Sequence, residues 1–265
     1  MSDPMQPPRH RTPPRCAAAL VAGAALALVF LAPAAQALGG KTPDISGSWG
    51  HAFPRPGQPA PNPLLITPPP GDPPLKPDYL AQWKAMRAKQ KEADAKGEPT
   101  AGMEARCLPD GMPNLMFAIY PLEILQTPGR VTVIEEAFSQ VRRIYLGEEQ
   151  GKIGDVEPGY YGHSVAHWEG DVLVVDTIGI KESVPGYRDM PHSDQEHITE
   201  RIRLVAPNIL HDDMTVEDPG VLERPWSFSF AYARLPGYKM LEYVCENNRE
   251  YLDENGGIHM KLLGQ

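Results

Sequence analysis

The feature that most constrains the fold is a long series of short segments, after Cys107, in which apolar and polar residues alternate. They are rich in Val, Ile, Tyr and Phe and are separated by Gly, Pro, Asp and Asn, which is typical of antiparallel β-strands joined by turns. The predicted strands, with one before Cys107, are Ile45–Gly50, Leu122–Gln126, Val131–Glu136, Ser139–Leu146, His163–Trp168, Val172–Ile178, Ile198–Val205, Met214–Glu217, Trp226–Ala233 and Met240–Cys245. So many strands can close an antiparallel barrel or build a two-sheet sandwich, and closure would remove exposed strand edges.

Two segments interrupt this pattern. Residues 51–77 are crowded with prolines, which lack the N–H that a strand ladder needs, so we predict an extended Pro-rich arm. Residues 78–97 predict an accessory helix that Asp78 can cap and Gly97 ends. Its apolar face has three- and four-residue spacing and consists of Tyr79, Leu80, Trp83 and Met86. The prediction is a single all-β domain over residues 38–265, with this arm and this helix.

The first 37 residues are typical of a secretory signal peptide. Three arginines precede an apolar run from Ala17 to Pro33, and Ala35-Gln36-Ala37 has the small-x-small pattern of a cleavage site. We expect cleavage after Ala37, a periplasmic or secreted protein, and no membrane association afterwards. An uncleaved anchor is the alternative, although the run is short for a bilayer span and no basic cluster follows it.

The charge of the remaining chain argues against nucleic-acid binding. The full sequence has 25 Lys and Arg against 34 Asp and Glu, and loss of residues 1–37 leaves 22 against 33, a net charge of −11. Nucleic-acid binding draws on clustered basic residues, so we expect a small-molecule partner instead. The sequence carries no signal for oligomeric state.

Two cysteines, Cys107 and Cys245, remain after signal cleavage. In an oxidising compartment we expect them to pair, and a bridge closing so long a loop would stabilise the fold by about 3–5 kcal/mol. Neither cysteine has the clustered spacing of a zinc site.

Imidazoles and carboxylates concentrate between Tyr160 and Arg203. This set is the usual material of an acid–base or metal site. Its members are His163, His167, His192, His197, Asp176, Asp194, Glu196 and Glu200.

Strand geometry narrows the choice among them. His163 and His167 share one strand face but lie about 13 Å apart, too far to chelate one metal. His163 follows a glycine-flanked stretch in which Tyr161 can contact a ligand, and the next strand brings Asp176 near it. A hydrogen-bonded histidine with a purely structural role is the alternative for His163 and, more so, for His167.

Glu200 shares a strand face with Ile198 and Ile202, which predicts that its carboxylate points into the protein. A buried carboxylate must be neutral or paired, so Glu200 is a functional candidate. The structural alternative is a buried salt bridge to Arg142 or Arg143.

A loop and an aromatic strand complete the candidate site. His192 and Asp194 precede the Glu200 strand and His197 begins it, so all three can lean over a cavity mouth. Together with Glu200 they can also supply nitrogen and oxygen ligands for zinc or iron. Trp226 and Phe228 begin an alternating aromatic stripe that predicts either a pocket for a flat apolar molecule or plain core packing.

Two resemblances accompany these patterns. Gly47-Ser48-Trp49 resembles the first strand of lipocalins, where the tryptophan closes one end of the barrel. Most of the chain resembles a large group of uncharacterised exported bacterial proteins, which implies export and an all-β architecture but no reaction. The blocks that carry this second resemblance are DISGSW, CLPDGMP, PLEILQTPGRVTVIEE, RRIYL, GHSVAHWEGDVLVVDTIG, PHSDQEHITERIR, MTVEDP, RPW and EYVCENNR.

The functional hypothesis is a cofactor-free acid–base enzyme, a lyase, isomerase or hydrolase acting on a small apolar or aromatic substrate. Glu200 and His163 would exchange protons with the substrate while His192 and His197 position it. Two alternatives remain open: a periplasmic protein that binds a hydrophobic ligand without catalysis, and an enzyme that uses a divalent metal held by histidines and carboxylates.

Overall fold

The computed structural model describes residues 42–51, 62–98, 103, 107–117 and 119–243, and the backbone of residues 250–252 and 258–260. The chain divides into a unit of residues Met1–Gly39 and a unit of residues Gly40–Gln265. The predicted signal peptide, residues 1–37, lies outside the described residues, so its cleavage stays a prediction. Among the described helices, none combines the length and the apolar composition that crossing a bilayer requires.

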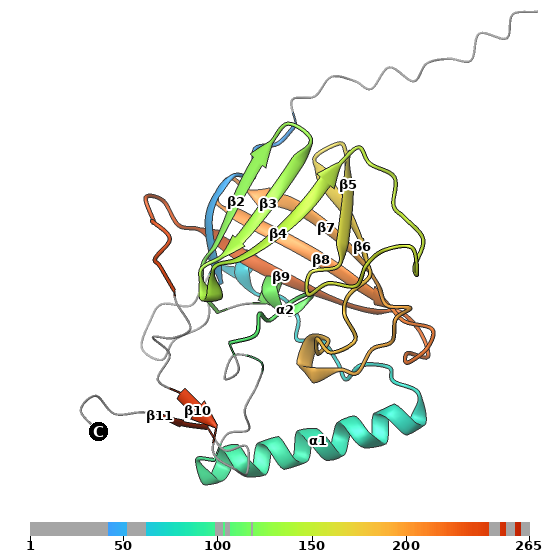
Figure 1. Ribbon diagram of the computed structural model, residues 1–265. Coiled ribbons are helices and arrows are strands. Elements are labelled where there is room, and N and C mark those ends of the chain that lie inside the picture. The colour runs from blue at the N-terminus through green and yellow to red at the C-terminus, as the bar shows by residue number, and fades with distance from the viewer. Residues whose placement is uncertain are drawn as a thin grey trace, which may run out of the picture. The chain divides into compact units, whose positions relative to one another are not determined.

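Nine strands of the described chain close a β-barrel in sequence order (Figure 1). They are β1 (Gly47–His51), β2 (Leu122–Thr127), β3 (Arg130–Glu135), β4 (Gln140–Leu146), β5 (His163–Glu169), β6 (Val172–Ile178), β7 (His197–Ala206), β8 (Ile209–Glu217) and β9 (Trp226–Arg234). Neighbours are antiparallel, β1 and β9 included, except for the parallel pair β4–β5. The predicted all-β fold is confirmed, as a barrel and not as a sandwich. Two further strands, β10 (Glu250–Leu252) and β11 (Ile258–Met260), pair with each other.

The strand directions place most long connections at one end of the barrel. The links β3–β4, β6–β7 and β8–β9 and the segment entering β2 all lie there, and we call this the loop-covered end. It also carries α2 (Asn114–Phe117), seen below the strands in Figure 1. The turns β2–β3, β5–β6 and β7–β8 at the opposite end are each two residues long. Functional side chains are therefore to be sought at the loop-covered end.

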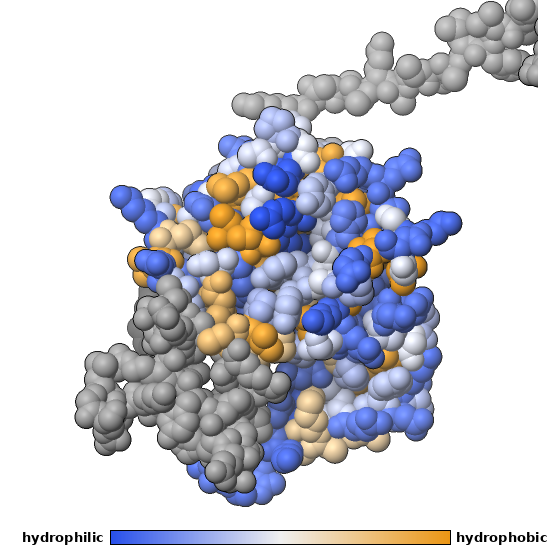
Figure 2. All heavy atoms as spheres, viewed as in Figure 1, coloured by the Kyte–Doolittle hydropathy of each residue, from blue (hydrophilic) through white to orange (hydrophobic). Residues whose placement is uncertain are grey.

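Alternation along the strands separates the two faces of the barrel wall as predicted. Ile198, Glu200 and Ile202 of β7 are buried, and so are Trp226 and Phe228 of β9. On the outer surface, Figure 2 shows mostly hydrophilic side chains with scattered apolar ones on the viewed face.

Two strand predictions need correction. β8 begins at Ile209 and not at Met214, because the polar run from His211 to Asp213 masks the alternation. Residues 240–243 form no strand, and Cys245 lies outside the described residues. The N–H of Leu241 donates instead to the Glu136 side chain.

The helix matches its predicted bounds within one residue, whereas the described part of the arm, predicted as extended, contains the short 3-10 helix η1 (Pro63–Leu65). Helix α1 spans Pro77–Lys96 and ends at Gly97, which adopts the left-handed φ of 72° that favours glycine. Asp78 lies in the first turn without capping it, since Lys76 takes the cap position. The part of the arm that is described lies along the barrel: Leu75 pairs with Leu222.

Trp49 of β1 is fully buried, as the lipocalin-like motif implies. Its Nε1 donates to the carbonyl of Ile45 at 3.0 Å. The guanidinium of Arg234 lies 4.2 Å from the ring centroid, a cation–π contact that covers the indole.

Candidate functional site

A buried ion pair crosses the barrel interior. Arg142 of β4 and Glu200 of β7 are both fully buried, and each terminal guanidinium nitrogen donates to one carboxylate oxygen, Nη1 at 2.8 Å. Ser164 and Thr177 accept further hydrogen bonds from Arg142. The inward direction predicted for Glu200 is confirmed, and the salt bridge with Arg142, left open by the sequence, is its observed environment. This pairing makes Glu200 a poor proton acceptor for a substrate.

Asp212 of β8 is a second buried carboxyl beside this pair. Neither of its oxygens meets a hydrogen-bond donor among the described residues. Burial raises the pKa of Asp212 well above its usual range, and the charge of Glu200 raises it further while Arg142 opposes the shift. This shift favours the neutral form of Asp212 beside the ion pair of Arg142 and Glu200.

A different pair of carboxyls, Asp110 and Glu135, meets at the loop-covered end. The side-chain nitrogen of Gln140 donates to both, at 3.1 Å to Asp110 Oδ2 and 2.5 Å to Glu135 Oε2. The Gln140 Oε1 in turn accepts from the Tyr161 hydroxyl at 3.3 Å and the Gly111 N–H at 3.4 Å. Glu135 is fully buried, whereas Asp110 and Tyr161 are partly exposed. One shared amide thus links two carboxyls and a phenol at the edge of the barrel.

The surroundings of these side chains raise the pKa of Glu135, of Asp110 and of Tyr161. Burial and the nearby charge of Asp110 raise the pKa of Glu135 to about 9, against the opposing hydrogen bond from Gln140. Burial also raises the pKa of Asp110, again opposed by Gln140. Burial and the charges of Glu135 and Asp110 raise the pKa of Tyr161. Glu135 is consequently protonated at pH 7 next to a more acidic carboxyl, the arrangement by which enzymes assign acid and base roles.

The backbone that follows Asp110 packs closely against the segment that carries Tyr161. Gly111 has a φ of 69°, and a Cβ there would lie 2.6 Å from both the Tyr160 carbonyl and Val184 Cγ1. The Met112 N–H donates to the same Tyr160 carbonyl at 2.9 Å. These contacts lock the Asp110 loop against the segment that carries Tyr161.

Backbone strain accompanies the same carboxyls. Phe138 and Ser139, between Glu135 and Gln140, have φ values of 56° and 49°. Such left-handed backbone costs on the order of 1–2 kcal/mol for each non-glycine residue. This strained turn holds Glu135 and Gln140 in their shared geometry.

An aromatic cluster lies at the same end. The predicted stripe on β9 is confirmed, because Trp226, Phe228, Phe230 and Tyr232 are all buried inside the barrel. Tyr187, from the turn η4 (Tyr187–Asp189) between β6 and β7, packs on it with its ring centroid 4.5 Å from that of Phe228.

His163 and His167 do not face the barrel interior. They lie on the outer face of β5, whose inward residues are Ser164 and Ala166. The His163 ring stacks on Tyr145, with centroids 5.7 Å apart. His163 and Glu200 are thus on opposite faces of the barrel wall, and the structure does not bring together the pair that was expected to exchange protons.

His197 and Asp176 meet on the outer surface. His197 Nε2 lies 2.7 Å from Asp176 Oδ2, and its Nδ1 lies 3.5 Å from Glu217 Oε2. The hydrogen bond to Asp176 raises the pKa of His197, and burial opposes the shift. Burial alone would raise the pKa of Asp176, but hydrogen bonds from His197 and Gln150 outweigh it and lower that pKa.

His192 is buried in the β6–β7 loop. Its Nε2 lies 2.6 Å from the Val184 carbonyl, and its Nδ1 lies 3.1 Å from the Ser193 carbonyl and 3.2 Å from Glu196 Oε2. Both ring nitrogens thus lie within reach of oxygen atoms of the same loop. Burial raises the pKa of Glu196 to about 7, with His192 opposing the shift. Asp194, by contrast, is exposed.

The proposed metal ligands therefore do not converge. Glu200 is inside the barrel, and His197 is on its outer wall. The ring nitrogens of His192 contact backbone carbonyls of the β6–β7 loop. Elsewhere in the described chain, no group of three or more His, Cys, Asp or Glu side chains has metal-binding geometry. The expected disulfide partner Cys245 lies outside the described residues, so its pairing with Cys107 stays a prediction.

Asp110, Glu135 and Asp212 are not among the site residues predicted from the sequence. Glu135 carried a usable signal, since Val131, Val133 and Glu135 share one strand face in the same way as the residues around Glu200. Asp110 lies in an irregular loop, where no periodicity points to a partner.

No protein-family model matches this sequence, and none of the curated proteins matches it.

Proposed function

We propose that this protein is a cofactor-free acid–base enzyme whose site is the carboxyl pair Asp110–Glu135 with Gln140 and Tyr161. The single observation that carries the proposal is the Gln140 amide, which donates to two carboxyls of different acidity at the loop-covered end. A small, largely apolar or aromatic substrate of a lyase, isomerase or hydrolase reaction suits this position, because the aromatic cluster lies at the same end.

In this proposal Asp110 is the general base, since it is the less buried of the two carboxyls and the pKa of Glu135 is raised to about 9. It accepts a proton from the substrate and returns it later in the reaction. Glu135 remains protonated while Asp110 is charged, because two adjacent carboxylates cannot both ionise at low cost. Protonation of Asp110 removes that repulsion, so the pair titrates as a unit. In this proposal the Tyr161 hydroxyl turns away from Gln140 Oε1 and donates its hydrogen bond to the anion that forms on the substrate.

Proton exchange with solvent tests the proposal without knowledge of the product. The mature protein is incubated in D₂O with a panel of small aromatic and aliphatic carbonyl compounds, and deuterium incorporation is followed by NMR. We expect Asp110→Asn to lower the exchange rate by about 10²–10⁴-fold. Tyr161→Phe should lower it less, and Asp155→Asn, in an exposed loop, should leave it unchanged.

Two results would contradict the proposal. One is exchange that survives in Asp110→Asn at the wild-type rate. The other is the absence of exchange with every compound in the panel, measured on protein whose circular dichroism confirms folding.

A second candidate function is binding of a hydrophobic ligand without turnover. The aromatic stripe favours it, because the cluster is connected to the surface by Phe117, which is 38% exposed and packs 5.6 Å from Phe230. Tight binding of an aromatic compound, with Asp110→Asn and wild type equal in every respect, would favour this candidate over the enzyme.

Export is part of the proposal as well. The N-terminal pattern and the resemblance to exported bacterial proteins support removal of residues 1–37 and a periplasmic or secreted protein. N-terminal sequencing of protein from a bacterial periplasmic fraction should begin at Leu38, and an intact Met1 would contradict export by this route.

A further inference from the structure

Tyr187 fills the aromatic stripe although it belongs to a loop and not to the barrel wall. Its ring centroid lies 4.5 Å from Phe228, 5.4 Å from Phe230 and 5.9 Å from Trp226. Phe117 of α2 contacts the ring from another side at 5.1 Å. The ring is thus surrounded on several sides by aromatic groups, the environment in which a flat aromatic ligand is bound.

The turn that carries Tyr187 is strained. Arg188 and Asp189, the next two residues, both have a φ of 58°, the left-handed region that non-glycine residues rarely adopt. Strained backbone persists only where neighbouring structure holds it. A tyrosine can pack in a protein core without left-handed backbone beside it, so the strain at Arg188 and Asp189 arises from the way this loop inserts Tyr187.

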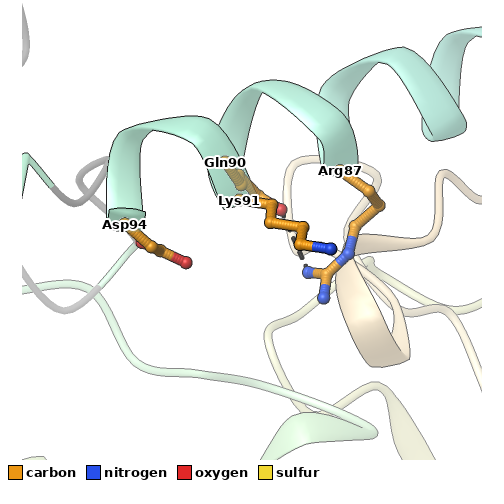
Figure 3. Close-up of a pocket in the computed structure, with 4 residues that line it drawn as sticks. All are labelled: Arg87, Gln90, Lys91 and Asp94. Atoms are coloured by element: carbon orange, nitrogen blue, oxygen red, sulfur yellow. Dashed lines mark hydrogen bonds between the residues drawn. The ribbon is translucent and has the colours of Figure 1, made fainter. Parts of the chain in front are cut away.

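Helix α1 holds the turn from outside. Trp83 Nε1 donates to the Arg188 carbonyl at 3.0 Å, and Arg87 Nη1 donates to Asp189 Oδ2 at 2.9 Å. We call these two contacts the α1 latch. Gln90 adds a bond to the same Asp189 oxygen at 3.3 Å. Figure 3 shows Arg87 and Gln90 on the side of α1 that faces this turn.

The latch is weakly protected from water. Trp83 is the one buried residue of α1, and the side chains of Arg87 and Asp189 are each 41% exposed. An open pocket lies beside the latch, lined by Arg87, Gln90, Lys91 and Asp94 (Figure 3). Half-exposed ion pairs hold little free energy, so the Arg87–Asp189 contact of the latch can release under a modest competing interaction, after which the Trp83 hydrogen bond alone holds the turn from α1.

We propose that the aromatic stripe is the binding site for a planar aromatic ring of the substrate, and that Tyr187 occupies this site until the substrate displaces it. Release of the α1 latch lets the strained turn relax and withdraws the tyrosine ring. The inference rests on the proposed function and adds the substrate class to it: a phenol-sized ring bound at the same end of the barrel as Asp110 and Glu135.

Binding of 4-methylphenol, which has the shape of the tyrosine side chain, tests the inference by calorimetry on the mature protein. Arg87→Ala removes the ion pair, and Trp83→Phe removes the N–H donor while keeping an aromatic ring. Each variant should bind the probe at least threefold more tightly than wild type. Lys84→Ala, an exposed substitution on the same helix, is the matched control and should equal wild type.

Hydrogen exchange supplies an independent readout. The Met190 N–H bonds the Tyr187 carbonyl and the Gly186 N–H bonds the Met190 carbonyl, so withdrawal of the tyrosine breaks this turn. The probe should therefore speed exchange of residues 186–190. Equal affinity in all four proteins, binding in none of them, or exchange that slows or stays constant on binding would each overturn the inference. Deuterium exchange that is lost in Asp110→Asn, together with no gain of probe affinity in Arg87→Ala, would overturn this inference and leave the catalytic role of Asp110 standing, so the two can fail separately.

Discussion

In the buried cluster of Arg142, Glu200 and Asp212, we predict that Asp212 can take over from Glu200 as the counter-ion of Arg142, which we call its reserve role. In the native protein Glu200 forms the salt bridge that balances Arg142, and the raised pKa of Asp212 favours its neutral form beside that pair. Glu200→Gln removes the negative charge without changing the volume. Asp212 should then ionise: burial still raises its pKa, but the charge of Glu200 no longer adds to that shift and Arg142, left without a counter-ion, lowers it.

The expected magnitudes follow from the burial of the cluster. Two unit charges about 4 Å apart interact by about 4 kcal/mol at an effective dielectric constant of about 20. Breaking a buried pair by removing one partner costs about 3–5 kcal/mol. We expect this full loss only in the double variant Glu200→Gln/Asp212→Asn, which leaves Arg142 unpaired. Glu200→Gln alone should cost about 1–2 kcal/mol and Asp212→Asn less than about 1 kcal/mol, since an amide retains a donor toward Glu200.

Urea unfolding at pH 7, followed by circular dichroism for the four proteins, measures these free energies. The reasoning predicts that the double variant loses more than the two single variants together, by roughly 1–3 kcal/mol. Additive losses would refute the reserve role of Asp212. A loss in Asp212→Asn as large as that in Glu200→Gln would also refute it, because it would mean that Asp212 is charged in the native protein.

Three further predictions concern other parts of the fold. Because the pKa of Glu135 is raised from 4.5 to about 9, its stabilisation is complete below pH 4.5 and is lost as the pH rises through 9. The unfolding free energy of wild type should fall by about 1.4 kcal/mol per pH unit across that window relative to Glu135→Gln, and parallel pH curves would contradict this. Gly111→Ala should lower the free energy of urea unfolding by about 2–4 kcal/mol, because the added Cβ would meet backbone and the φ is left-handed. The control Gly129→Ala, where φ is also positive but the space is open, should lower it by about 1 kcal/mol. Equal losses in the two variants would show that steric contact at Gly111 is unimportant. Peptide mapping without reduction should recover Cys107 linked to Cys245, with reduction lowering stability by about 3–5 kcal/mol, and alkylation of both thiols in untreated protein would argue against the bridge.

Strand alternation made much of the fold predictable. It located most of the strands, placed Glu200 in the interior and identified the stripe that begins at Trp226. These statements depend only on local side-chain direction, which a strand determines by itself. The helix was predictable for a similar reason, since its period and Gly97 are local signals.

The candidate site was less predictable because its partners depend on register and on irregular backbone. Whether Arg142 or Arg143 faces Glu200 depends on which face of β4 points inward, and the structure buries Gln140, Arg142 and Ile144 while it exposes Arg143. His163 had the right residue type on the wrong face, since the inner face of β5 belongs to Ser164. Asp110 reaches Gln140 across a loop with no periodic pattern.

The odd number of strands in the barrel has a consequence for the segment between β4 and β5. A ring of antiparallel neighbours needs an even count, so nine strands require one parallel pair, and here the chain must travel the full height of the wall to begin β5. That return path ends by delivering Tyr161 beside Asp110. A shorter link could only join β5 to β4 as an antiparallel hairpin, which would move the parallel pair elsewhere in the nine-stranded ring and take the phenol away from the carboxyl pair.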